Sequence, residues 1–118
     1  MHLGTHYIAL AVKDIKRSKA FYEKLGFEAD TRRGSVEEKW LVMINGDIKI
    51  GLFQDMFPRN VLTFNPPDVR ALHERLEMED GIEIAQAANM DRESGPCHFS
   101  IIDPDGNPIL FDQLETEG

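Results

Sequence analysis

The sequence passes twice through the same order of elements, and this repeat restricts the possible folds more than any other feature. In each half, a strand pattern leads into an aspartate and then into a helical pattern. Asp14 and Asp68, which we expect to cap the two helices, are 54 residues apart. Further strand patterns follow each helix. The repeat predicts two βαβββ modules, residues 1–57 and 58–118, within a single domain spanning 1–118.

Strands are predicted where apolar residues alternate with other residues, because such alternation gives a strand two different faces. The Asn45-Gly46 dipeptide is a strong hairpin signal between two of these patterns. The patterns cover residues 7–12, 39–44, 48–53, 60–65, 82–84, 98–102 and 108–113. We therefore expect an α+β fold in which the two modules form an open, curled mixed β-sheet with the helices on its convex face.

Charge and composition limit the kinds of molecule that the protein is expected to bind. The net charge of −8 argues against nucleic-acid binding, because an acidic surface repels phosphate groups, and it would suit a cationic ligand. No apolar run approaches the roughly 20 residues of a membrane helix, and the first residues lack a signal-peptide pattern. Cys97 is the single cysteine and cannot form an internal disulfide, so we expect a cytoplasmic protein.

Two motifs carry a resemblance to a known family. The first runs from Ile8 to Asp14 and continues through Phe21-Tyr22 to Leu25-Gly26-Phe27, and the second is the turn from Asp103 to Ile109. With these motifs the chain resembles the vicinal oxygen chelate superfamily, which includes glyoxalase I, bleomycin-resistance proteins and extradiol dioxygenases. Both motifs also have structural explanations as helix cap, packing residues and turn, so we assign them no chemistry.

The resemblance implies four metal-ligand positions on the concave wall of the sheet. In this sequence they fall on Tyr7, Gly51, Val61 and Leu110. Gly51, Val61 and Leu110 have no side chain that could donate a lone pair to a divalent metal, and one tyrosine does not make a site. We therefore expect no metal and no cofactor.

Because alternate residues of a strand share a face, the sequence predicts which residues would line a pocket on this wall. Trp40 could stack on a flat or cationic ligand, or it could fill a core or a dimer interface. His98 is expected on the concave wall, whereas His6 and His73 are expected at a strand start or in solvent. The candidate ligand-binding residues are Tyr7, Trp40, Gly51, Phe53, Val61, Thr63, His98, Ser100, Leu110 and Asp112.

These observations favour a metal-free protein that binds or sequesters a cationic or aromatic small molecule and has no catalytic residue. The resemblance also implies a homodimer. Two enzymatic alternatives stay open. One is a metal-dependent lyase or dioxygenase whose ligands have moved to His98 and Asp112. The other is a metal-independent enzyme in which His98 or Tyr7 transfers a proton.

Overall fold

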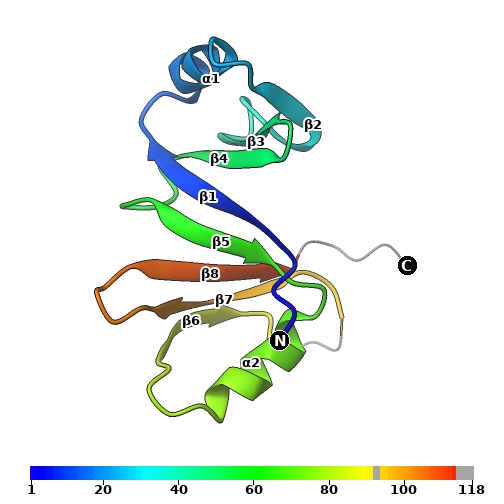
Figure 1. Cartoon of the computed structure of the whole chain (residues 1–118), viewed down its shortest axis with the longest axis vertical. Helices are drawn as coiled ribbons and strands as arrows, with labels where there is room; N and C mark the ends of the chain where they lie inside the picture. The colour runs from blue at the N-terminus through cyan, green and yellow to red at the C-terminus, as the bar shows by residue number, and fades with distance from the viewer. Residues whose placement is uncertain (92–93, 114–118) are drawn as a thin grey trace. The chain divides into compact units, whose positions relative to one another are not determined.

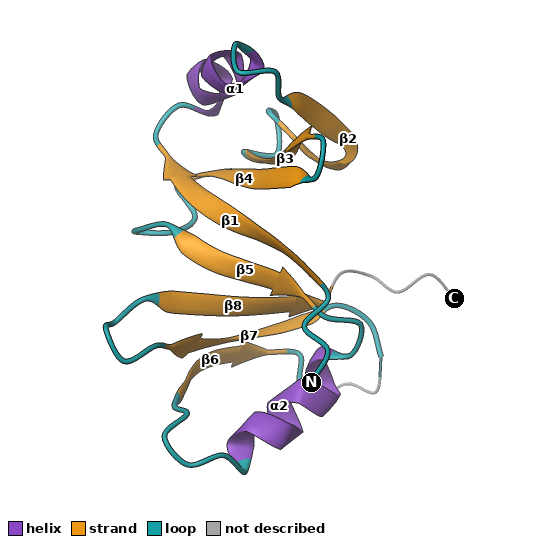
Figure 2. Cartoon of the chain, in the orientation of Figure 1, coloured by secondary structure: helices purple, strands orange, loops and turns teal. Residues whose placement is uncertain are grey.

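Eight strands and two helices are formed by residues 1–91 and 94–113, which are the residues that the computed structural model describes. They divide into two units, named here the α1 unit (7–61) and the α2 unit (1–6, 62–91 and 94–113). Figures 1 and 2 show the elements. In chain order they are β1 (Thr5–Val12), α1 (Ile15–Glu23), β2 (Glu28–Ser35), β3 (Trp40–Asn45), β4 (Ile48–Gln54), β5 (Val61–Asn65), α2 (Val69–Glu77), β6 (Ile84–Ala88), β7 (Cys97–Ile102) and β8 (Pro108–Gln113).

The α1 unit contains strands in the order β2-β3-β4-β1. Strand β1 is parallel to β4, with Ile8 opposite Ile50, while β3 is antiparallel to both β2 and β4. Helix α1 covers one face of these strands (Figure 2). Its buried core consists of Ile15, Leu41, Met43, Ile50 and Leu52.

The α2 unit repeats this topology with strands in the order β6-β7-β8-β5. Strand β5 is parallel to β8, and β7 is antiparallel to both β6 and β8. Its buried core consists of Val69, Leu72, Leu76, Cys97, Phe99, Ile101 and Phe111. The predicted α+β class and the two βαβββ modules with open, mixed strand pairing are confirmed.

Each helix begins at the aspartate that the sequence predicts. The side chains of Asp14 and Asp68 accept hydrogen bonds from the backbone N–H groups of Arg17 and Ala71. Such caps satisfy N–H groups that have no partner within the helix. Both helices have nine residues, and no helix within the described part of the chain is long and apolar enough to cross a membrane.

Two strands differ from the expectation. Strand β2 was not predicted, because its sequence is largely polar and its pairing with β3 is interrupted by a bulge between Ala29 and Gly34. The strand expected at 82–84 instead runs from Ile84 to Ala88, so that prediction was wrong in position. Its register is also irregular, between Ile84 and Gln86, which weakens the alternation on which the prediction depended.

Candidate functional site

In the α1 unit, the strand register places the predicted lining residues on the face that points away from α1. Trp40 lies opposite Phe53, and Gly51 lies opposite both Val42 and Ala9. Their immediate neighbours Leu41, Ile50 and Leu52 point to the other face, where they pack in the core under α1.

Four aromatic side chains meet on this face. The rings of Trp40 and Phe53 are stacked, with centroids 5.9 Å apart and planes 15° apart. Tyr7 is nearly parallel to Phe53 at 6.4 Å and 7°, and Phe57 lies 5.2 Å from Phe53 at 60°. Tyr7 is only 5% exposed, whereas the other three are half-buried. We name these four residues the aromatic platform.

Two of these rings fill the space beside Gly51. A Cβ atom added at Gly51 would lie 2.6 Å from Cε2 of Phe53 and 2.7 Å from Cε2 of Tyr7. Carbon atoms in contact prefer about 3.5–4.0 Å, so no side chain fits at this position without displacing a ring. A metal-ligating glutamate at position 51 would require a different arrangement of Tyr7 and Phe53.

The residues at the four implied ligand positions do not fit the divalent metal of the vicinal oxygen chelate superfamily. Gly51 and its neighbours Ile50 and Leu52 provide no donor, so a one-residue change of alignment would not restore one. Val61 and Leu110 are hydrocarbon side chains as well. Within residues 1–91 and 94–113, no cluster of three or more His, Cys, Asp or Glu residues is arranged to hold a metal ion.

The α2 unit carries a second group of predicted residues on the face away from α2. His98 lies opposite Asp112, and Leu110 lies opposite both Ser100 and Thr63. Thr63 is fully buried, whereas the His98 side chain is exposed. Burial raises the pKa of the Asp112 carboxyl above its ordinary value, and the charge of His98 opposes this shift.

Two other histidines, His6 and His73, contact protein groups. His6 is exposed, its Nδ1 lies 3.1 Å from the carbonyl oxygen of Thr63, and its ring contacts Phe64. The expectation that His73 faces solvent was wrong. Its side chain is 17% exposed, its ring meets the edge of Phe99 at 5.0 Å, and its Nδ1 lies 3.1 Å from Glu77.

Sequence reasoning missed a charged cluster in the bulge of β2. Asp30 is 8% exposed, and its Oδ1 accepts hydrogen bonds from both the backbone N–H and the Nε of Arg32. Its Oδ2 lies 3.8 Å from Nε of Arg33. The only signal in the sequence is the spacing of an acid and two bases in a polar segment, which is too common to single out a site.

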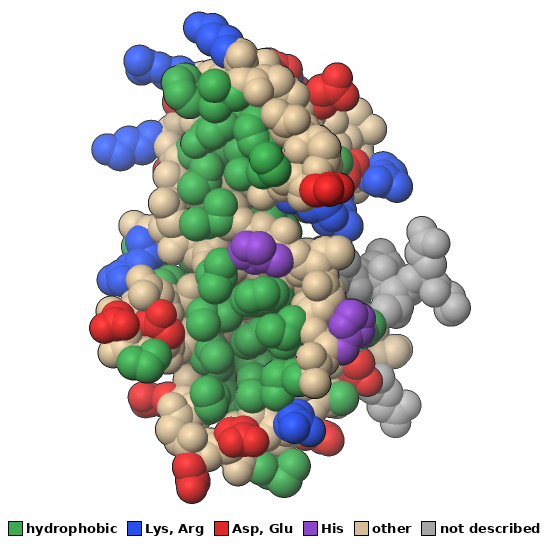
Figure 3. Space-filling model, in the orientation of Figure 1, with side chains coloured by type: hydrophobic (Ala, Val, Ile, Leu, Met, Phe, Trp, Pro, Cys, Tyr) green, Lys and Arg blue, Asp and Glu red, His purple; other side chains and the backbone are tan. Residues whose placement is uncertain are grey.

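The charge of the chain is divided unevenly between the units. Residues 7–61 contain ten Lys and Arg against eight Asp and Glu, a net charge of +2, whereas the rest of the chain contains three against thirteen, a net charge of −10. Figure 3 shows both basic and acidic side chains around the part that carries α1 and mainly acidic side chains around the part that carries α2. The net negative charge of the whole chain therefore does not apply to the unit that contains the aromatic platform.

A shallow depression of about 410 Å³ lies on the α1 side of the α1 unit and not at the platform. It is formed by the end of β1 and the first turns of α1, and its lining includes Leu10, Arg17, Phe21 and Asn60. Part of its wall is held in place by Asn60, whose side-chain oxygen accepts a hydrogen bond from the backbone N–H of Ala11.

Comparisons with known proteins identify a family and several structures with the same fold. The model of the Glyoxalase/Bleomycin resistance protein/Dioxygenase superfamily matches residues 4–111. No curated protein matches the sequence. A superfamily member from Vibrio splendidus 12B01 is similar at 20% identity and a TM-score of 0.66, with 92% of this chain and 97% of that chain covered.

Two further structures have different described activities. A protein from Legionella pneumophila described as an NAD-dependent benzaldehyde dehydrogenase is similar at 21% identity and a TM-score of 0.72, covering 94% of this chain and 100% of that one. Methylmalonyl-CoA epimerase from Mycobacterium tuberculosis is similar at 14% identity and a TM-score of 0.71, covering 98% and 90%. At these identities the likeness concerns the fold alone and selects no reaction.

The close contacts around Gly51 predict that replacing this glycine by alanine destabilises the protein, which is the opposite of the usual effect. Replacing a glycine inside a strand by alanine ordinarily stabilises a protein, because glycine loses more backbone entropy on folding. Gly51→Ala should instead lower the free energy of unfolding by about 1–3 kcal/mol, because the new methyl group overpacks Tyr7 and Phe53. Urea denaturation measures this change. The loss should shrink in a Phe53→Leu background, and a stabilising Gly51→Ala would show that the rings do not fill this space.

The raised pKa of Asp112 predicts a pH-dependent effect of Asp112→Asn. Because the folded protein holds this proton to higher pH than the unfolded chain does, stability decreases as pH rises through the interval between the two pKa values. Asp112→Asn removes that decrease, so the variant should gain stability relative to the parent between pH 3 and pH 7 in denaturation experiments. Asp105→Asn controls for net charge. A gain that is the same at all pH values would contradict the prediction.

Proposed function

Because the chain belongs to the Glyoxalase/Bleomycin resistance protein/Dioxygenase superfamily, we propose that it is a small-molecule-binding protein that uses this fold without a metal centre. The proposed ligand is a flat aromatic compound that contacts the aromatic platform. The observation that carries this proposal is the filling of the Gly51 position by the rings of Tyr7 and Phe53. Aromatic surface stands where a metal-using member needs a donor.

The platform has properties suited to a flat ligand. Trp40, Phe53 and Phe57 are half-buried, so part of each ring is accessible while the rest is held by neighbours. Trp40 is held from the other side as well, because a Cβ atom at Gly34 would lie 2.8 Å from Cδ2 of its indole. Rings that are fixed in this way lose little entropy when a ligand stacks on them, and aromatic pairs contribute about 0.5–1.5 kcal/mol beyond burial.

The metal-dependent alternative has little support in the described residues. His98 and Asp112 lie opposite each other, but they are two groups, fewer than the three protein ligands of a catalytic zinc site. Proton transfer by His98 or Tyr7 would require a substrate held beside either side chain. Tyr7 is 5% exposed and packed parallel to Phe53, so little of its side chain is accessible to a substrate.

The charge distribution favours an aromatic ligand over a cationic one. The expectation of a cationic ligand depends on the acidity of the whole chain, but the residues that carry the platform have a net charge of +2. A surrounding of this sign does not attract cations. The proposal therefore commits to aromatic surface as the recognised feature.

We also propose that the protein is a homodimer that uses the exposed apolar side chains of the α1 unit. Phe21 and Leu25 are each 58% exposed, and Phe21 borders the depression described above. Apolar surface of this kind is usual at contacts between proteins.

The proposed location is the cytoplasm. Cys97 is a free and buried thiol, and burial raises its pKa above the ordinary value. A protonated, buried thiol is a poor nucleophile and takes no part in disulfide exchange. This agrees with a protein that works in a reducing compartment.

Ligand binding can be tested with naphthalene-2-carboxamide, a neutral bicyclic aromatic probe. Trp40 is the single tryptophan, so stacking on the platform should quench the intrinsic fluorescence of the protein. By calorimetry, Trp40→Leu should weaken binding about tenfold, which corresponds to the upper range of an aromatic contact. Phe64→Leu, a change on the face covered by α2, is the matched control. Excess chelator should change neither stability nor binding, and a requirement for one divalent ion per chain would overturn the proposal.

The dimer can be tested by sedimentation equilibrium. The parent protein should sediment as a dimer, and Phe21→Glu together with Leu25→Glu should give a monomer, because the charges would have to be buried in the contact. Met78→Glu changes an equally apolar and even more exposed residue at the end of α2 and serves as the control. A monomeric parent at micromolar concentration would refute the dimer.

A further inference from the structure

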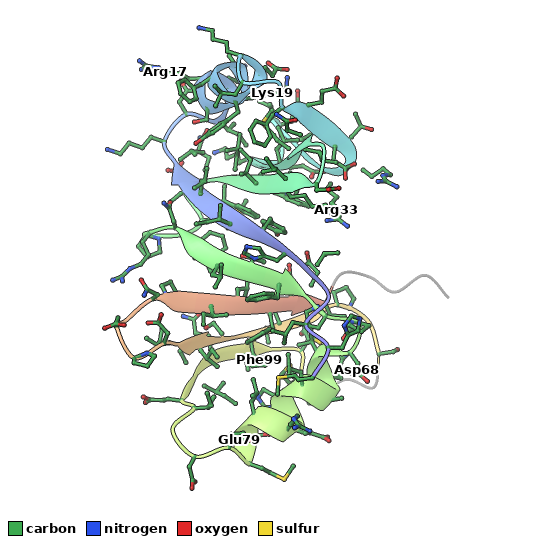
Figure 4. All side chains as sticks on the ribbon, in the orientation of Figure 1. Arg17, Lys19, Arg33, Asp68, Glu79 and Phe99 are labelled. Atoms are coloured by element: carbon green, nitrogen blue, oxygen red, sulfur yellow. The ribbon has the colours of Figure 1, made fainter. Side chains whose placement is uncertain are left out.

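The bulge of β2 places a charged group on the same face as the aromatic platform. Ala29 lies opposite Met43 and packs in the core under α1, so the next residue, Asp30, points to the opposite face. Ser35, at the other end of the bulge, lies opposite Trp40 and shares its face. Arg33 contacts the Asp30 carboxylate, and in the view of Figure 4 Arg33 lies on the side of β4 that is away from α1.

Arg33 keeps hydrogen-bonding capacity that the protein does not use. Its Nη1 is buried and has no hydrogen-bond partner among the described residues, and its contact with Asp30 is long, at 3.8 Å through Nε. A buried donor without an acceptor is costly and rare, and it calls for a specific explanation. Arg70 also leaves one nitrogen without an acceptor, but its other nitrogens donate to carbonyl groups of Asn89, Ser94 and Gly95, so Arg70 fastens a loop.

The cluster around Arg33 has an excess of positive charge. One carboxylate, Asp30, faces two guanidinium groups, Arg32 and Arg33. Burial opposes ionisation of Asp30, but the hydrogen bonds from Arg32 and the charges of both arginines hold its pKa below the ordinary value, so the carboxylate is charged at neutral pH. The half-buried Lys49 adds another cation on this face, and Glu28, which is exposed, adds an acid.

We infer that the aromatic ligand of the platform carries a carboxylate, which accepts hydrogen bonds from the guanidinium of Arg33. This inference rests on the proposed function and narrows its ligand class to aromatic acids. A planar guanidinium presents several N–H donors in a fixed fork that matches a carboxylate. Gly34 supports the juxtaposition, because the backbone next to Arg33 lies against the indole of Trp40. Stacking would hold the ring while Arg33 binds its acidic substituent.

Two probes of the same shape test the inference. 2-Naphthoate is an anion at neutral pH, and naphthalene-2-carboxamide is its neutral counterpart with the same ring system. Calorimetry should give an affinity at least about tenfold higher for the acid, as expected when an anionic acceptor replaces a neutral one at a positively charged donor. This comparison on the parent protein requires no variant and therefore does not depend on whether a variant folds.

Variants then assign the preference to one residue. Arg33→Gln should bring the ratio of the two affinities close to one. Arg32→Gln removes the same charge from the same bulge at a side chain that is 85% exposed, and it should keep most of the preference. Circular dichroism checks that both variants fold.

The outcomes separate this inference from the proposed function. Equal affinities of the parent for acid and amide would refute the preference for an anionic ligand but not the proposal that the platform binds aromatic compounds. Binding of neither probe would overturn the platform, and the inference with it. A preference that survives Arg33→Gln but is lost in Arg32→Gln would refute the role of Arg33.

Discussion

In each module, one side-chain hydrogen bond connects the start of the helix to the last residue of a strand. Gln54, the last residue of β4, accepts from the backbone N–H of Ile15 at 2.9 Å, and Gln113, the last residue of β8, accepts from Val69 at 2.8 Å. Because β4 and β8 are parallel to the strands that precede the helices, these bonds fix the register of each parallel pair against its helix. A slip of one residue would turn every side chain of a strand to the other face.

This shared frame makes positions in the two modules comparable. Phe53 and Asp112 each precede the glutamine, and their partners on the neighbouring strand are Trp40 and His98. The same pair of positions therefore holds stacked aromatic rings in one module and an acid opposite an imidazole in the other. The two halves therefore share their strand topology and differ in side-chain chemistry, as the net charges of +2 and −10 also show.

Much of this arrangement follows from local sequence. Alternation gives the faces of Trp40 and Phe53, and the two aspartates give the helix starts. The filling of the Gly51 position could not be predicted, because it depends on rings from β1 and β4 meeting across the strand pair. The glutamine bonds span 39 and 44 residues and leave no local signal. Arg33 was missed for a related reason, since its strand is polar and its direction is set by a bulge.

The replacement of metal donors by rings changes what the fold needs in order to be stable. A metal site gathers polar donors that lose hydrogen bonds with water on folding, and the ion compensates for that loss, so folding and metal binding become coupled. Tyr7 and Phe53 instead meet by apolar contact, which needs no ion. Under the proposed function, recognition then has two separate sources. Stacking selects flat molecules through contact area, and the guanidinium of Arg33, a side chain that is 27% exposed, selects among them by charge.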